Sequence, residues 1–165
     1  MNLQPAPRPE DRESAASEAD RLEIRMWLRL LTCTTLIERQ LRNRLSSAFD
    51  TTLPRFDALA QLERVPDGLT MGQLSARMMV SGGNVTGVVD RLVKDGLVER
   101  VDVPGDRRRN LVRLTDEGRA RFAEMAAEHH RTLHRLLADL DHDAIESLFA
   151  LLGRLKDSVR NQSDA

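Results

Sequence analysis

Two groups of side chains in the middle of the chain are suited to contacting double-stranded DNA. Asn84 and Thr86 stand near the start of a predicted helix, where an amide can pair with adenine and a threonine with thymine. Three consecutive arginines follow further along, and arginine favours the negative potential of a narrow minor groove. Ser81 and Arg91 are placed for phosphate contacts. The predicted DNA-contacting set is Ser81, Asn84, Thr86, Arg91, Arg107, Arg108 and Arg109.

Positive charge is concentrated where these side chains lie. The chain of 165 residues has a net charge of −1, which excludes a generally basic, DNA-coating protein. From Arg91 to Arg121, nine Lys and Arg residues stand against six Asp and Glu residues, a local net charge of +3. Any affinity for DNA must therefore come from this segment.

Two short helices joined by a tight turn are predicted to position the first group. Thr70 is suited to cap a helix over 71–79, and Ser81 is suited to cap a second helix that ends before Gly96. The inner face of the second helix is formed by Val85, Val88, Val89 and Leu92. This pattern is typical of a helix-turn-helix.

Three glycines in the second helix, Gly82, Gly83 and Gly87, call for an explanation. Each costs roughly 1 kcal/mol of helix propensity relative to alanine. Either the first turn needs glycine sterically, or the helix backbone approaches DNA closely. Both interpretations stay open on the sequence.

The hydrophobic period changes after the second helix. Residues 97–101 and 110–114 are short β-type runs on either side of a Pro-Gly-Asp turn. They predict a β-hairpin, or wing, whose loop carries the three arginines. Asp106 in the turn is placed to hold the Arg108 guanidinium.

Helical segments flank this module. An apolar stripe from Leu22 through Cys33 to Leu45 predicts one long helix over 18–49. A short helix over 55–64 follows it. After the hairpin, Thr115 and Asp141 are suited to cap two more helices.

Residues 69–118 resemble the core of the MarR family of bacterial regulators. The shared motifs are Val-Asp-Arg-Leu at 89–92, Gly-Leu-Val-Glu-Arg at 96–100, Asp-x-Arg at 106–108 and Leu-Thr-x-x-Gly at 114–118. The resemblance implies a homodimer with interleaved terminal helices, which reads a palindromic operator with two helices and two wings. Arg108 matches the family's minor-groove arginine. Gly82 and Gly87 replace residues that are often basic, which shifts the expected base contacts to Asn84 and Thr86.

The expected fold is therefore mainly α with a small β-wing: a winged helix-turn-helix flanked by N- and C-terminal dimerisation helices. The expected divisions are an arm at 1–17, an N-terminal dimerisation helix at 18–52, a DNA-binding lobe at 53–118 and C-terminal dimerisation helices at 119–165.

Family resemblance also implies a small-molecule effector between the dimer helices and the DNA-binding lobe, whose binding weakens DNA binding through a population shift. The segments LLTCTTLIE, FDTTLPRFDALAQLERVPDGL and SGGNVTG are similar to a branch controlling hydroxycinnamate catabolism, where repressors respond to aryl-CoA thioesters such as p-coumaroyl-CoA. Arginines beside aromatic rings suit such an anion. The candidate effector residues are Arg25, Trp27, Arg29, Cys33, Arg39, Arg42, Arg55 and Phe56.

Other interpretations remain open. Trp27 could be a core residue beside solvated arginines, the effector could be a free phenolic acid, and Cys33 could sense peroxide. Cys33 lies in the apolar stripe, and the sequence has no tyrosine that could hydrogen-bond its thiolate. Both features instead favour Cys33 as a small buried residue. His130 and His134 share a helical face beside His129, but no metal or cofactor is expected.

Enzyme motifs are absent from the sequence, so an enzyme is not expected. A winged helix that binds a protein partner in place of DNA is disfavoured, because such modules tend to lose the basic wing and this sequence retains it. One cysteine excludes an intramolecular disulfide and fits a reducing compartment. With no secretion signal and no apolar run of membrane-spanning length, we expect a cytoplasmic protein without a membrane partner.

Overall fold

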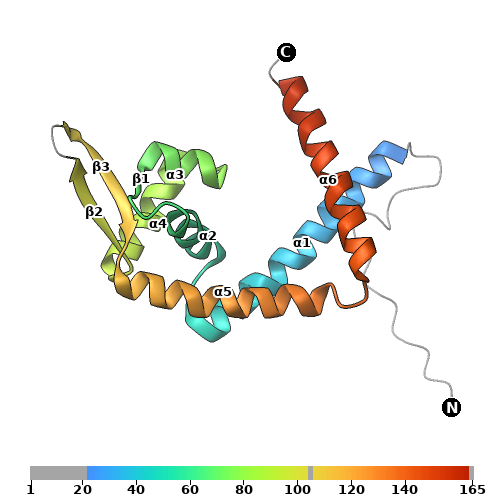
Figure 1. Ribbon diagram of the computed structural model, residues 1–165, viewed down its shortest axis with the longest axis horizontal. Helices are drawn as coiled ribbons and strands as arrows, with labels where there is room; N and C mark the ends of the chain where they lie inside the picture. Colours follow the sequence, from blue (N-terminus) through green and yellow to red (C-terminus); the bar gives the residue numbers. More distant parts are fainter. Residues whose placement is uncertain (1–21, 104–105, 164–165) are drawn as a thin grey trace.

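A lobe built around a small sheet lies at one end of the molecule, and long helices lead away from it (Figure 1). The computed structural model describes residues 22–103 and 106–163, and the backbone alone at 103, 106–109 and 163. The predicted arm at 1–17 lies outside the described residues. In chain order the elements are α1 (Leu22–Phe49), α2 (Leu53–Glu63), β1 (Leu69–Thr70), α3 (Met71–Met78), α4 (Gly82–Lys94), β2 (Val98–Val103), β3 (Asp106–Leu114), α5 (Asp116–Leu136) and α6 (His142–Ser163).

Side-chain caps begin three of the helices where the sequence predicts them. The Thr70 hydroxyl accepts a hydrogen bond from the backbone N–H of Gln73 at 3.2 Å, and the Gln73 amide oxygen accepts one from the Thr70 N–H at 2.9 Å. Thr115 and Asp141 cap α5 and α6 in a similar way. Since these bonds satisfy backbone donors that a helix leaves unpaired, they define where each helix begins.

The sheet contains one strand more than the sequence predicts. The order is β1-β3-β2, all antiparallel, and the two-residue β1 places Leu69 opposite Val112. Pairing of β2 with β3 continues to Val103 opposite Asp106. Arg107, Arg108 and Arg109 therefore lie in β3, and the prediction that the hairpin loop carries them is wrong. Three consecutive charged residues show no apolar alternation, so the sequence did not reveal a strand there.

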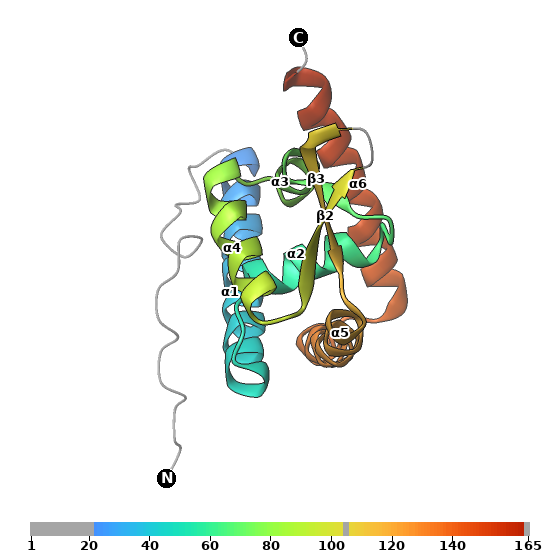
Figure 2. The same ribbon diagram turned by 90° about the vertical axis from the view of Figure 1, so that its left-hand side faces the viewer.

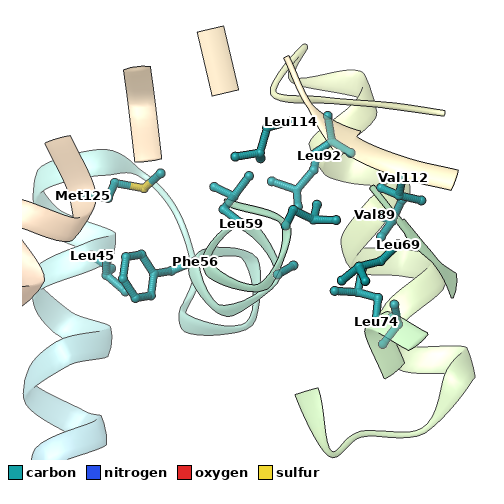
Figure 3. Packing of buried hydrophobic residues seen from close by; sticks show 14 residues of the cluster. Leu45, Phe56, Leu59, Leu69, Leu74, Val89, Leu92, Val112, Leu114 and Met125 are labelled. Carbon is teal, nitrogen blue, oxygen red and sulfur yellow. The ribbon is translucent and has the colours of Figure 1, made fainter. Parts of the chain in front are cut away.

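One core holds the lobe together (Figure 3). Val85, Val89 and Leu92 are almost fully buried and Val88 is partly buried against the same core, which confirms the predicted inner face of the second helix. Leu45 of α1 and Met125 of α5 join the same cluster, so both long helices are anchored in the lobe.

Gly118 allows α5 to start against the hairpin. A Cβ atom at this position would lie 1.9 Å from the Leu97 carbonyl oxygen, far inside van der Waals contact. The same carbonyl accepts a hydrogen bond from the Thr115 N–H at 3.2 Å. The glycine of the Leu-Thr-x-x-Gly motif thus allows the first turn of α5 to pack closely on the residue before β2.

The predicted stripe on α1 is buried only near its end. Leu41 and Leu45 are buried, but Cys33 is exposed in the single chain, and the expectation that it is a small buried residue is wrong. Thr32 is the buried residue at that level. Because successive helical residues are separated by about 100°, Cys33 points well away from the face that is covered.

Apolar side chains on α1 and α6 remain exposed in the single chain. Trp27 is 55% exposed, so its interpretation as a core residue of the chain is wrong. Figure 2, which looks along α5, shows α1 and α6 on opposite sides of it. The large exposed apolar residues of these two helices are Leu22, Ile24, Met26, Trp27, Leu36, Ile145, Leu148, Phe149, Leu151, Leu152 and Val159. Within the part of the chain that the structure describes, no helix is long and apolar enough to cross a membrane.

Candidate nucleic-acid interface and ligand groove

The outer face of α4 carries the predicted base-contacting residues. Ser81, Asn84, Thr86 and Arg91 are all exposed, while Val85, Val89 and Leu92 of the same helix are buried in the core. The Thr86 hydroxyl donates a hydrogen bond to the Gly82 carbonyl at 3.1 Å. Polar side chains that could contact the bases or phosphates of DNA therefore lie on the side of α4 that faces away from the lobe.

The glycines of α4 are not required by packing within the chain. A Cβ atom added at Gly82, Gly83 or Gly87 would meet nothing within 4 Å. The interpretation that the first turn needs glycine sterically is therefore wrong for the single chain. A bare helix surface is instead available for close approach by another molecule.

The hairpin is tied to α4 by an ion pair that the sequence analysis missed. An Arg100 guanidinium nitrogen on β2 lies 2.6 Å from the Asp90 carboxylate on α4. Across the hairpin, Arg113 Nε lies 2.7 Å from Glu99. The first contact joins β2 to α4, and the second joins β3 to β2. The side chains of Asp106 and of the three wing arginines lie outside the described residues, so the predicted contact between Asp106 and Arg108 does too.

An open groove of about 590 Å³ brings predicted DNA-binding and effector residues together. Three guanidinium groups and no carboxylate contribute to its wall. Arg42 comes from α1 and Arg55 from α2, while Arg91 belongs to the same helix as Asn84. Its lining residues are Arg42, Thr52, Pro54, Arg55, Asn84, Gly87, Val88 and Arg91. The groove is suited to an anion bound directly beside α4.

Each of these arginines has a carboxylate partner. Arg42 lies 3.6 Å from Glu38, one turn earlier on α1. Arg55 and Arg91 share Asp95, at 3.6 Å and 3.4 Å. Sequence reasoning missed Asp95, although a signal was present: a carboxylate at a helix C-terminus opposes the helix dipole, which indicates a cationic partner.

The other predicted effector residues lie elsewhere. Phe56 is buried in the lobe core, where its ring stacks on His129 at 4.6 Å and lies 5.6 Å from Phe122. The groove thus gathers only Arg42 and Arg55 of the eight candidates. The remaining five are exposed along α1, outside the groove: Arg25, Trp27, Arg29, Cys33 and Arg39.

A second cluster of charge joins α1 to α5. Glu128 is buried on α5 and forms hydrogen-bonded ion pairs with Arg44 of α1 and Arg131 of its own helix. These bonds, that from Arg44 first, lower the Glu128 pKa to about 2. The carboxylate therefore stays ionised and links the two helices at neutral pH.

The neighbouring histidines do not form a metal site in the described residues. His129 packs on Phe56, and burial, with the nearby His130 as a lesser cause, lowers its pKa. Among the described residues, no group of three His, Cys, Asp or Glu side chains is placed to hold a metal ion.

Known proteins with similar sequences and folds are transcriptional regulators. The sequence profile of the MarR family matches residues 49–109. The HTH-type transcriptional regulator PecS of Dickeya dadantii is 31% identical over 128 residues, which cover 76% of each chain. A MarR family transcriptional regulator from Silicibacter pomeroyi superposes with a TM-score of 0.70 at 36% identity, covering 87% of this chain and 99% of that one.

A further solved structure contains a ligand. The PcaV transcriptional regulator from Streptomyces coelicolor, in complex with its natural ligand, superposes with a TM-score of 0.66 at 28% identity. The match covers 88% of this chain and 99% of PcaV. The similarity thus extends beyond the helix-turn-helix to the long helices on both sides.

Proposed function

The chain belongs to the MarR family of DNA-binding transcriptional regulators, and we propose that it is a repressor released from its operator by an anionic aromatic ligand. The observation that carries this proposal is the groove in which Arg42, Arg55 and Arg91 meet beside Asn84. A ligand held there touches the helix that faces DNA. It can therefore favour an arrangement of the lobe that misfits the operator.

For DNA binding, we assign base reading to α4 and much of the affinity to the hairpin. Asn84 and Thr86 contact base edges in the major groove, and Ser81 and Arg91 contact phosphates. The wing arginines, Arg107, Arg108 and Arg109, enter or flank the minor groove. The open space around the α4 glycines supports this assignment, since the helix backbone can approach the bases closely.

A second copy of the chain completes the regulator in this proposal. The exposed apolar residues of α1 and α6 are too many for a free surface of a soluble domain and suit a homodimer interface. Two copies of α4 related by a twofold axis then read a palindromic operator. Binding to chromosomal DNA places the protein in the cytoplasm.

The ligand class follows from charge and from the resemblance to hydroxycinnamate regulators. We propose an aryl-CoA thioester such as p-coumaroyl-CoA, which would make the regulated genes those of hydroxycinnamate catabolism. Three guanidinium groups favour a phosphate-bearing ligand over a free phenolic acid with one carboxylate. Arg39, three residues before Arg42 on α1 and exposed, is a further candidate for contact with the CoA phosphates.

Operator release tests this function. Fluorescence anisotropy of a labelled duplex from the intergenic DNA upstream of the gene measures affinity alone and with p-coumaroyl-CoA, p-coumarate or CoA. We expect p-coumaroyl-CoA to lower the affinity at least about tenfold, since a smaller coupling would hardly change operator occupancy. Arg42→Gln should raise the ligand concentration needed for release about tenfold, as expected for a lost charged hydrogen bond.

Arg64→Gln provides the matched control, because Arg64 is exposed at the end of α2 and outside the groove. This variant should respond to the ligand like the parent. If the parent binds the duplex but none of the three compounds alters the affinity, the proposed ligand class is wrong. Asn84→Ala should change the preference among base substitutions in the operator, and an unchanged preference would remove Asn84 from the reading set.

Peroxide sensing is a second candidate, favoured by one observation. The Cys33 thiol is exposed in the single chain, as a redox sensor requires. Peroxide should then release the parent from the operator but not Cys33→Ala. Equal responses of the two proteins would eliminate this candidate.

A further inference from the structure

Asp95 bridges the two sides of the ligand groove. Its Oδ1 lies 3.4 Å from Arg91 Nε, one turn earlier on α4, and its Oδ2 lies 3.6 Å from an Arg55 guanidinium nitrogen on α2. One carboxylate thus engages two of the three arginines of the groove, each through a different oxygen. It also connects the C-terminal end of α4 to α2.

The carboxylate itself lies behind the groove. Asp95 and Arg55 line a second cavity of about 420 Å³, on the side of Phe49 and Met125, whereas Asp95 is not part of the groove wall. Arg55 lines both cavities, whereas Arg91 lines only the groove. The two arginines are therefore held from one side by an internal anion and are open to a second anion from the other.

Neither ion pair is strong enough to prevent an external anion from taking the place of Asp95 on the two arginines. The Asp95 side chain is one-third exposed, the Arg91 side chain is half exposed, and both pairs are longer than a good charged hydrogen bond. Pairs of this kind contribute little net free energy. A ligand whose oxygens reach both guanidinium groups forms shorter, bidentate contacts in place of them.

We propose that Asp95 is a built-in competitor for the ligand, which holds Arg55 and Arg91 until a phosphate or pyrophosphate group takes them. With Arg42 the groove offers three positive charges, so a multiply charged phosphoryl group is the anion that displaces Asp95. Displacement removes the ion-pair link between α2 and the end of α4, and leaves the two helices joined by their packing in the core. The occupied groove is thereby coupled to the orientation of the helix that faces DNA.

The identity of the natural ligand rests on the function proposed above, but the competition does not. Inorganic pyrophosphate is therefore the first probe, and p-coumaroyl-CoA is the second. Asp95→Asn removes the competing charge and keeps the side-chain size. Glu99→Gln is the matched control, since Glu99 also pairs with an arginine but lies on the sheet, outside the groove.

Isothermal titration at constant ionic strength with each probe tests the proposal. We expect pyrophosphate to bind Asp95→Asn about threefold to tenfold more tightly than the parent, as the loss of two weak pairs predicts, and Glu99→Gln to match the parent. Equal affinities of Asp95→Asn and parent overturn the proposal. So does an equal gain in Glu99→Gln, which would show a general charge effect, or a lack of pyrophosphate binding in all three proteins. If pyrophosphate behaves as expected but p-coumaroyl-CoA binds none of them, the competition stands and the aryl-CoA proposal fails.

Discussion

The lobe and the helices that leave it bury their apolar side chains by different means. In the lobe, α2, α3, α4 and the sheet enclose one core within a single chain. On α6, by contrast, none of the described residues is buried, and Phe149 is 80% exposed. The lobe therefore buries its apolar side chains within one chain, whereas those of α6 and of the first half of α1 need a partner surface to become buried. We therefore assign DNA reading to the lobe and assembly to the outer helices, and α1 and α5 both connect the two parts (Figure 1).

The largest expected effect lies on α6. Phe149→Asp places a charge in the apolar face that we assign to the dimer, so we expect the dimer dissociation constant to rise at least about 100-fold, as for other central interface aromatics. Sedimentation velocity across a concentration series measures this constant. Helical spacing places Ser147 on the opposite side of α6, so Ser147→Asp should leave the constant unchanged. A dimer that survives Phe149→Asp would place the interface elsewhere.

Truncation of the lobe core should destabilise the fold itself. Leu59 is fully buried at the centre of the core, so Leu59→Ala should lower the free energy of unfolding by about 2–5 kcal/mol. Urea denaturation monitored by circular dichroism gives this value. Leu22→Ala, at a position 75% exposed in the single chain, should change it by less than about 0.5 kcal/mol in a monomeric background such as Phe149→Asp. Similar losses at both positions would contradict the division between lobe and outer helices.

The wing should contribute affinity more than sequence preference. Arg108→Ala should weaken operator binding roughly tenfold and reduce the slope of log affinity against log salt by about 1, because one cationic contact to DNA is lost. Anisotropy titrations at several salt concentrations measure both quantities, with Arg64→Ala as the control at an exposed site away from the hairpin. An unchanged affinity and slope would remove Arg108 from the interface.

The smallest expected effect concerns the junction between lobe and outer helices. The pKa of Glu128, about 2, lies below its ordinary value of 4.5 because Arg44 and Arg131 bind the ionised form. A lowered folded-state pKa means that the pairing stabilises the fold above about pH 4.5 and loses this contribution as the pH falls toward 2. Glu128→Gln lacks this dependence. The difference in unfolding free energy between parent and variant should therefore shrink from pH 6 to pH 2, and a constant difference would contradict the assignment.

Local patterns were enough to predict much of the lobe. Thr70, Thr115 and Asp141 act through bonds to residues three positions later, so their caps were readable from the sequence, as were the two helices of the helix-turn-helix. β1 was missed because two residues are too few to show a period. The strand extension through Arg107 was missed because its pairing partners lie on β2.

Tertiary contacts account for the remaining differences. Nothing local indicates that Asp95 meets Arg55 of another helix, although its place at a helix end hinted at a cationic partner. The exposure of Cys33 depends on which side of α1 the other helices cover. The apolar stripe on α1 is longer than the part of it that is buried within one chain. Family resemblance indicated the groove in outline, but only the fold showed that Arg42, Arg55 and Arg91 meet there and that Phe56 does not.

Sedimentation velocity of the parent chain, alone and with a labelled operator duplex, tests the central claim most directly. Two chains at micromolar concentration and two chains on each operator are the predicted result, because we propose that each lobe reads one half-site and that the outer helices join two lobes. A chain that stays monomeric at these concentrations and occupies the whole operator as a single copy would contradict the account.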